Sequence, residues 1–310
     1  MHCVVAGGRN EVALVLCHGF PELWCSWKKL IQPLALKYKV IVPTLRGFGQ
    51  SSAPEDVNAY SFQELTTDLA QLLDHFNIKK AIFIGHDHGG ALVWRMCLYY
   101  PERVLAVASF CTPYTPPKDT YVSIQDIVKV LPQFAYQLYF QTDQARIEFE
   151  SNLELFFKTF LRGAKVKTPV NPPPFVYSAG PILPTVPKDL DIHPMLTQQE
   201  FNYYVQQYKH SGLKGALNWY RTHKINFEIE KTKKFNVVIP HKALMVTAGR
   251  DVVLPPSMAN NMPNLIPNLT MVNIEEANHW ILLDYPERCT EVLLNWLATV
   301  DTQKSNKANL

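Results

Sequence analysis

Asp87 is the residue whose type and position most directly suggest chemistry. It lies in the stretch Ala81–Gly90, which reads Ala-Ile-Phe-Ile-Gly-His-Asp-His-Gly-Gly. The apolar, β-branched start predicts a buried strand, and the helical spacing of apolar side chains from His88 to Tyr100 predicts a helix. The glycines between them predict a sharp strand-to-helix turn that holds the Asp87 side chain out over the sheet. A carboxylate in front of a helix N-terminus is ionised at neutral pH and is a nucleophile that needs no activating base.

Two further groups that can act with Asp87 follow later strands. Asp251 comes just after the predicted strand Lys242–Ala248, and His279 comes after the predicted strand Leu269–Ile274. Functional groups in open parallel sheets gather at the carboxyl ends of strands. We therefore expect these three side chains to meet in one crevice.

The order nucleophile, acid, histidine predicts a two-step displacement. Asp87 would attack a saturated carbon and form an alkyl ester, and His279, oriented by Asp251, would activate the water that hydrolyses this ester. The oxyanion would then form on the aspartate itself. We expect the backbone N–H groups of Phe20 and His88 to stabilise it.

The elements that position these groups alternate along the chain. We predict strands at Cys3–Ala6, Val12–Cys17, Tyr38–Pro43, Ala81–Ile84, Val104–Cys111, Lys242–Ala248 and Leu269–Ile274. We predict helices at Leu23–Leu36, Ser61–Phe76, His88–Tyr100, Pro256–Met262 and Pro286–Val300. This alternation indicates βαβ units and a mainly parallel sheet. The aromatic, proline-punctuated segment 113–240 shows no such alternation, so we predict a helical insertion within an α/β core made of residues 1–112 and 241–310.

Composition narrows the class of protein. The 310 residues are 47% hydrophobic and 18% charged, which is ordinary for a soluble enzyme, and the net charge of +3 with scattered basic residues gives no reason to expect a nucleic-acid partner. The sequence has no apolar run of transmembrane length and no signal-peptide pattern, and its six cysteines have no CxxC spacing. These features favour a reduced cytoplasmic protein. The final Ala308-Asn309-Leu310 resembles an atypical peroxisomal signal, with a frayed polar tail as the equal alternative.

Five motifs carry a family resemblance. They are His18-Gly-Phe-Pro-Glu22, Gly85-His-Asp-His-Gly-Gly90, Tyr136-Gln-Leu-Tyr-Phe140, Leu217-Asn-Trp-Tyr-Arg221 and Met245-Val-Thr-Ala-Gly-Arg-Asp251. Together, and in this order over most of the chain, they resemble soluble epoxide hydrolases of the α/β-hydrolase superfamily. The resemblance implies an α/β-hydrolase fold with a helical cap, and hydrolysis of epoxides to vicinal diols with no metal and no organic cofactor.

The resemblance also implies the roles of residues in the insertion. Tyr136 and Tyr220 would donate hydrogen bonds to the oxirane oxygen, and four residues would line the substrate pocket: Pro21, Gln137, Trp219 and Trp280. The insertion is rich in phenylalanine, at Phe134, Phe140, Phe156, Phe157, Phe160 and Phe175, which predicts an apolar pocket for aryl or fatty epoxides. We expect a monomer or a homodimer.

Three features depart from the family pattern. His88 stands where tryptophan is common, which changes the shape and polarity of the pocket but keeps the backbone N–H. Asn278 stands before His279 where glycine is usual. The family also has another strand upstream of Cys3, so we expect either a truncated sequence or a sheet that is trimmed at this edge.

Other assignments remain open. Dehalogenation uses the same two carboxylates and histidine, and a non-catalytic binding protein can share the fold. A serine-type esterase is disfavoured because no serine occupies the turn. Glu275 and Glu276 are rival acids, but both are too near His279 along the chain to reach its ring easily. We expect structural roles for His18 and His86, and packing roles for the nearby tyrosines Tyr139, Tyr203 and Tyr204.

Overall fold

A seven-stranded sheet forms the centre of the computed structural model, which describes residues 1–8, 11–165 and 176–307, with side chains up to residue 300. Its strands are β1 (Cys3–Ala6), β2 (Ala13–Cys17), β3 (Lys39–Pro43), β4 (Ala81–His86), β5 (Val104–Phe110), β6 (Lys242–Ala248) and β7 (Leu269–Ile274). The strand order is β1-β3-β2-β4-β5-β6-β7, in which β1 pairs antiparallel with β3 and every other pair is parallel. All seven predicted strands are present, and the prediction of a mainly parallel sheet is confirmed.

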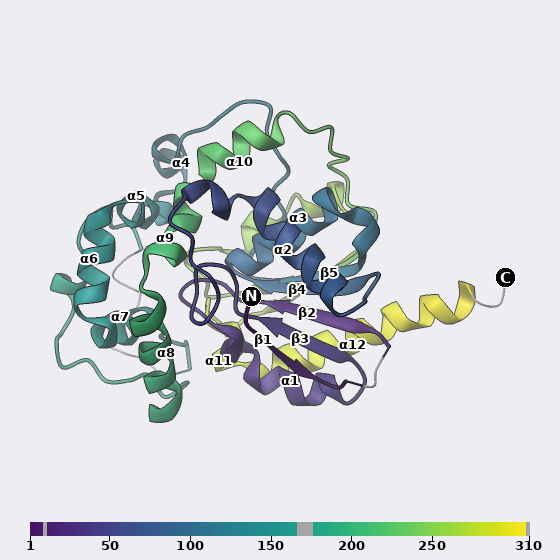
Figure 1. Ribbon diagram of the computed structural model, residues 1–310, viewed down its shortest axis with the longest axis horizontal. Coiled ribbons are helices and arrows are strands. Elements are labelled where there is room, and N and C mark those ends of the chain that lie inside the picture. The colour runs from purple at the N-terminus through teal and green to yellow at the C-terminus, as the bar shows by residue number, and fades with distance from the viewer. Residues whose placement is uncertain (9–10, 166–175, 308–310) are drawn as a thin grey trace.

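Helices cover both faces of this sheet. The helices α1 (Lys28–Ala35) and α12 (Pro286–Lys307) pack against each other on one face, and α2 (Phe62–His75) and α3 (His88–Tyr99) pack on the other (Figure 1). Every residue of β2 and β4 is therefore buried. This explains why these strands are continuous apolar runs and not alternating ones.

Short elements depart from the predictions. The helix predicted at Leu23–Leu36 begins as a 3-10 turn, η1 (Trp24–Trp27), before α1. The helix predicted at Pro256–Met262 is two 3-10 turns, η6 (Pro256–Ala259) and η7 (Met262–Asn264), each with a proline in its first turn. The four-residue helix α11 (Ile281–Asp284) was not predicted, because one turn is too short to show a helical period.

Between β5 and β6, all the regular secondary structure of the described residues is helical. Its α-helices are α4 (Ile124–Val130), α5 (Tyr136–Phe140), α6 (Asp143–Ser151), α7 (Leu153–Phe160), α8 (Gln198–Ser211), α9 (Lys214–Arg221) and α10 (His223–Glu230). The helices α5 to α9 gather to one side of the sheet, at the left of Figure 1. The remaining 3-10 turns are η2 (Val57–Tyr60), η3 (Pro101–Arg103), η4 (Pro132–Phe134) and η5 (Leu183–Thr185). The division at residues 113 and 240 stays a prediction.

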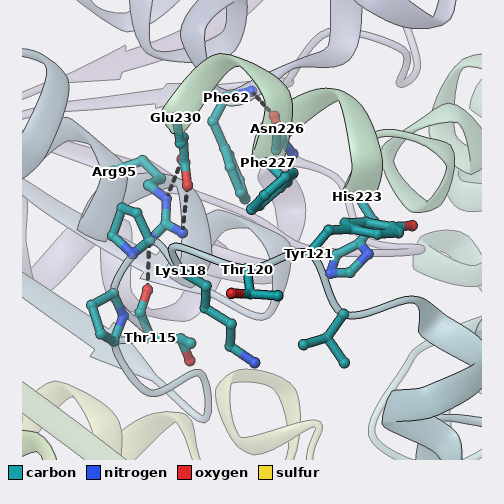
Figure 2. Close-up of a pocket in the computed structure, with 13 residues that line it drawn as sticks. Phe62, Arg95, Thr115, Lys118, Thr120, Tyr121, His223, Asn226, Phe227 and Glu230 are labelled. Carbon is teal, nitrogen blue, oxygen red and sulfur yellow. Dashed lines mark hydrogen bonds and ion pairs between the residues drawn. The ribbon is translucent and has the colours of Figure 1, made fainter. Parts of the chain in front are cut away.

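An ion pair joins α10 to the sheet-covering helix α3. Arg95 Nε donates to Glu230 Oε1 at 2.7 Å, and both side chains are largely buried. Arg95 also donates to the Thr115 carbonyl, and the Phe62 N–H at the start of α2 donates to the Asn226 carboxamide on α10. These contacts surround a cavity of about 130 Å³ between the insertion and the core (Figure 2). They fix the base of the insertion relative to the sheet.

Two predictions concern residues outside the part of the chain that the structure describes. They are Phe175 as a pocket residue and the tail Ala308-Asn309-Leu310 as a targeting signal. The six cysteines are all free thiols; five are buried and Cys3 is half-buried. Among the helices that the structure describes, none has both the length and the apolar character needed to cross a membrane.

Candidate active site

Asp87 lies at the tip of the turn between β4 and α3. Its φ of 52° is in a region that non-glycine residues seldom adopt, so the surrounding structure must hold it there. The turn packs so closely against β2 that a Cβ atom on Gly89 would lie 2.2 Å from the Cys17 carbonyl oxygen. A glycine at this position lets α3 begin directly against β2. The predicted strand–turn–helix is confirmed.

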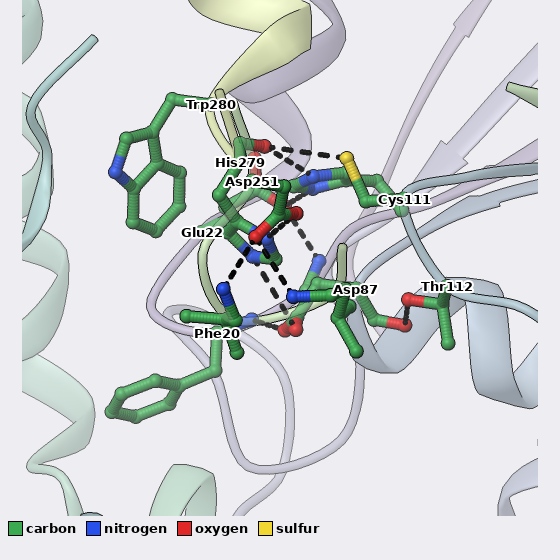
Figure 3. A network of polar contacts seen from close by, with 12 residues as sticks. Phe20, Glu22, Asp87, Cys111, Thr112, Asp251, His279 and Trp280 are labelled. Carbon is green, nitrogen blue, oxygen red and sulfur yellow. Dashed lines mark hydrogen bonds and ion pairs between the residues drawn. The ribbon is translucent and has the colours of Figure 1, made fainter. Parts of the chain in front are cut away.

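Backbone and side-chain donors hold the Asp87 carboxyl group and its carbonyl (Figure 3). The Phe20 N–H donates to Asp87 Oδ1 at 2.8 Å, and the Thr112 hydroxyl donates to the Asp87 main-chain carbonyl at 2.8 Å. A Cβ on Gly19 would lie 2.4 Å from the Asp87 Cβ, so only glycine allows this close approach of the loop. No hydrogen bond from the His88 N–H to this carboxylate occurs in the described part of the chain. Of the two expected backbone donors, only Phe20 therefore contacts the carboxylate directly.

His279 lies between two carboxylates. Its Nδ1 donates to Asp251 Oδ2 at 2.8 Å, and its Nε2 lies 3.5 Å from Asp87 Oδ2. The Asp251 side chain is fully buried, and its other oxygen accepts from the N–H groups of Val253 and Leu254, both at 2.9 Å. The predicted meeting of Asp87, Asp251 and His279 is therefore present in the structure.

The charges of these three groups support one another. Burial opposes ionisation of Asp87, but the neighbouring histidines outweigh it and hold the pKa of Asp87 well below its usual range. Burial likewise opposes ionisation of Asp251, and the charge and hydrogen bond of His279 lower its pKa. The two carboxylates in turn raise the pKa of His279 well above its usual value, against the effect of burial. The resting site is thus an imidazolium between two carboxylates.

The rival acids do not reach the histidine. Glu275 and Glu276 are exposed, and Glu275 accepts a hydrogen bond from the Asn273 carboxamide. The partner of His279 is therefore Asp251, as the position after β6 predicts.

Two other histidines act on the backbone around the site. His18 Nδ1 donates to the Gly19 carbonyl and its Nε2 accepts from the Leu45 N–H, and burial lowers the pKa of His18 to about 4. The ring of His86 lies between a Glu22 oxygen at 2.7 Å and the His279 carbonyl at 2.8 Å. The expected structural roles fit these contacts.

Glu22 is a member of this network that sequence reasoning missed. It is fully buried, and the oxygen that contacts His86 also accepts from the Gly19 N–H at 2.8 Å. Glu22 and His86 thereby connect the loop that carries the Phe20 donor to the backbone of His279 (Figure 3). The only sequence signal was a glutamate directly after the His-Gly-Phe-Pro run.

The two predicted tyrosines share a cavity of about 140 Å³ with the Asp87 carboxylate. Tyr136 from α5 and Tyr220 from α9 line this cavity with Asp87, and their rings lie 6.1 Å apart. Burial raises the pKa of both phenols, so both are protonated at neutral pH. The alternative tyrosines have hydroxyl contacts elsewhere: Tyr139 with Glu148, Tyr203 with Trp24, and Tyr204 with Ser26.

The predicted pocket residues are distributed unevenly around this cavity. Gln137 lines it, whereas Pro21, Trp219 and Trp280 are not among its lining residues. The Trp219 indole N–H donates to the Arg46 carbonyl, and the Trp280 ring lies 5.1 Å from that of His279. The lining residues that were not predicted are Ala91, Thr112, Val253 and Leu254. Thr112, Val253 and Leu254 each follow the carboxyl end of a strand, and this position is their only signal in the sequence. Ala91 lies within α3 and has no such signal.

Most of the predicted phenylalanines pack with one another instead of lining this cavity. Phe134 lines it, but Phe140, Phe156, Phe157 and Phe160 form a buried aromatic cluster in which Phe156 and Phe160 have ring centroids 4.5 Å apart. The cluster reaches the site through Phe140, whose ring lies 5.1 Å from that of Tyr220. These rings therefore support the wall of the cavity from behind.

One group of residues has the atom types of a metal site. His86, Cys111 and His279 bring a nitrogen or sulfur each to within 4.8 Å of the others. The His86 Nε2 and the Cys111 thiol both already contact the His279 carbonyl oxygen, and His279 Nδ1 is held by Asp251. The arrangement is that of a hydrogen-bonded network around the backbone of His279.

Comparison with known proteins places these observations in a family. Residues 12–286 match the family described as alpha/beta hydrolase fold. The chain is 40% identical to bifunctional epoxide hydrolase 2 of Mus musculus over 96% of its own length and 53% of that protein, and so spans about half the length of this curated relative. It is 30% identical to epoxide hydrolase srdG of Neurospora crassa, covering 92% of this chain and 86% of that one. The crystal structure of epoxide hydrolase A from Mycobacterium thermoresistibile matches with a TM-score of 0.85 and 31% identity, covering 96% and 94% of the two chains. This chain therefore belongs to the α/β-hydrolase fold family and, within it, to the epoxide hydrolases.

Proposed function

We propose that this chain hydrolyses epoxides to vicinal diols through a covalent ester on Asp87. The observation that carries the proposal is the environment of the Asp87 carboxylate, which accepts from the Phe20 N–H, lies 3.5 Å from His279 Nε2 and shares a cavity with two phenols. Opening a neutral epoxide needs a nucleophile on carbon and an acid on oxygen. Both are present in this cavity, and relatives named as epoxide hydrolases support the same reaction.

In the first step, an Asp87 oxygen attacks an oxirane carbon and the ring C–O bond breaks. The ring oxygen takes a proton from Tyr136 or Tyr220, which leaves a hydroxyalkyl ester and a phenolate. Since burial keeps both phenols protonated at neutral pH, two donors are available for the developing alkoxide. Donors that meet charge only as it develops stabilise the transition state more than the ground state.

Formation of the ester changes the charge on His279. Before the reaction, Asp251 and Asp87 together hold the imidazole protonated. Esterification removes the Asp87 charge, so the pKa of His279 falls and its proton can return to the phenolate. The neutral imidazole that results can accept a proton from water.

In the second step, His279 takes a proton from water, and the hydroxide attacks the carboxyl carbon of the Asp87 ester. The oxyanion forms on the Asp87 oxygen that accepts from the Phe20 N–H, with the His88 N–H as the second expected donor. Collapse releases the diol and regenerates the Asp87 carboxylate beside protonated His279. The net reaction adds one water to one epoxide.

The walls of the cavity favour apolar substrates. Phe134, Val253, Leu254 and Ala91 contribute apolar surface to these walls. We propose that the helical insertion acts as a cap that carries both phenols over the nucleophile. Action as a monomer or homodimer, in the cytoplasm or a peroxisome, stays a prediction.

A panel of aryl epoxides, fatty epoxides and haloalkanes tests the proposal, with diol and halide measured separately. We expect diol without halide from the wild-type chain, no diol from Asp87→Ala, and unchanged turnover in the matched control Asp126→Ala, whose side chain is exposed on α4. Halide release would favour dehalogenation instead. Absence of both products from folded protein would favour a binding role, and diol formation by Asp87→Ala would refute the ester mechanism.

A further inference from the structure

His88 brings a polar ring to the wall of the cavity beside Asp87. Its Nε2 is buried and has no hydrogen-bond partner among the described residues. The ring packs edge-on against Tyr220, with centroids 4.6 Å apart at 77°, and lies 5.4 Å from the Trp219 ring. A buried nitrogen without a partner is unfavourable, so such groups in native structures call for an explanation.

The imidazole of His88 is neutral at neutral pH. Burial lowers its pKa, and the nearby His279 acts in the same direction, while the Asp87 charge opposes them without reversing the shift. A neutral imidazole has one donor and one acceptor nitrogen. It can therefore pair with an uncharged group of either kind.

The other polar side chains of the cavity wall are already engaged. The Thr112 hydroxyl donates to the Asp87 carbonyl, and the Gln137 carboxamide lies 3.5 Å from the Tyr136 hydroxyl. The remaining side chains of the wall, apart from the reacting carboxylate and phenols, are apolar. His88 is thus the one non-reacting polar side chain of this wall, as the structure describes it, that leaves a buried nitrogen for a ligand to satisfy.

We propose that His88 is a specificity-determining residue that selects epoxides with an uncharged hydrogen-bonding group, a hydroxyl or a carbonyl, one or two bonds from the oxirane. Because Asp87 must touch an oxirane carbon, a group that close to the ring lies in the cavity that Asp87 and His88 both line. A carboxylate there would be repelled by Asp87, and an alkyl group would leave the His88 nitrogen unpaired. This inference rests on the proposed function.

A matched pair of substrates isolates the effect. One is trans-phenylglycidol, and the other is its isostere in which a methyl group replaces the hydroxyl. The ratio of their kcat/KM values is measured in the wild-type chain, in His88→Phe and in His88→Gln. Both variants keep the backbone N–H; phenylalanine removes the ring nitrogens, and glutamine restores a hydrogen-bonding group at a similar reach.

We expect the alcohol-to-isostere ratio to fall about five- to tenfold in His88→Phe, the factor for one ordinary hydrogen bond, and to stay within about twofold of wild type in His88→Gln. In the wild-type chain the alcohol should also have the lower KM. An unchanged ratio in His88→Phe, or a lower KM for the isostere, would overturn the role of His88 while leaving epoxide hydrolysis intact. Loss of fold in His88→Phe would leave the wild-type KM comparison as the deciding result, and no turnover of either substrate by wild type would refute the proposed function itself.

Discussion

Replacement of Asp251 by asparagine should move the proton of the neutral His279 ring from Nδ1 to Nε2. Asp251 Oδ1 accepts two hydrogen bonds, from the Val253 and Leu254 N–H groups, so this position must remain an oxygen after substitution. The carboxamide NH₂ is then forced to face His279 Nδ1, where Oδ2 accepted at 2.8 Å. Since two donors cannot share a hydrogen bond, the imidazole must carry its proton on Nε2 and cannot take one from water.

The size of the effect can be bounded from these contacts. Losing one charge-assisted hydrogen bond to a buried carboxylate costs about 1.5–3 kcal/mol, which slows ester hydrolysis about 10- to 150-fold. The wrong imidazole tautomer in a triad of this kind costs up to about 10⁴-fold in kcat. We therefore expect Asp251→Asn to slow the second step by between about 10- and 10⁴-fold, with a smaller effect on formation of the ester.

Rapid-quench single-turnover kinetics with intact-protein mass spectrometry separates the two steps. The variant should accumulate protein heavier by the mass of one epoxide, and diol should appear at the rate at which this species decays. The matched control is Glu275→Gln, which removes the nearest rival acid and should hydrolyse its ester at the wild-type rate. Unchanged ester hydrolysis in folded Asp251→Asn, or slow hydrolysis in Glu275→Gln, would refute the assignment of the acid.

Three further predictions follow from the geometry. Tyr136→Phe and Tyr220→Phe should each lower kcat/KM about 10-fold and the double variant about 10³-fold, because either phenol can partly replace the other as the acid. Steady-state kinetics measures this effect, with the exposed Tyr121→Phe as the control. Full activity of the double variant would contradict the prediction. Glu230→Gln should lower the free energy of unfolding by about 3 kcal/mol in denaturant titration, because it leaves Arg95 largely buried without its counter-charge; a loss below about 1 kcal/mol would show that the pair is unimportant. The rate of ester hydrolysis in single turnovers should rise with pH until His279 is neutral, because Asp251 still raises the pKa of His279 after esterification has removed the Asp87 charge, and only the neutral ring accepts a proton. A flat profile would exclude His279 as the base.

The positions of the reacting groups could be predicted because they depend on strand ends. Asp87, Asp251 and His279 each follow a buried apolar run, and adjacent parallel strands bring such positions together whatever the detailed packing. The contact of Glu22 with His86 spans 64 positions and two loops, and no periodicity links them. Such a buried pair is visible only once the turns are folded against each other.

The walls of the cavity were less predictable than its chemistry. The phenylalanine content of the insertion predicted an apolar lining, but Phe156 and Phe160 pack into an aromatic cluster instead. Helical periodicity identifies the face of a helix that is buried, not the cavity or core that this face meets. Val253 and Leu254 line the cavity and their N–H groups bind Asp251, and composition reveals neither contact.

The origin of the oxygen in the diol tests the central claim most directly. A single turnover of excess wild-type enzyme with an epoxide, in water labelled with oxygen-18, distinguishes an ester on Asp87 from direct attack by water. If Asp87 is the nucleophile, the first diol carries no label, and the peptide that contains Asp87 gains one oxygen-18. Label in the diol of this first turnover, with none in the peptide, would show that water attacks the epoxide directly and would contradict the account.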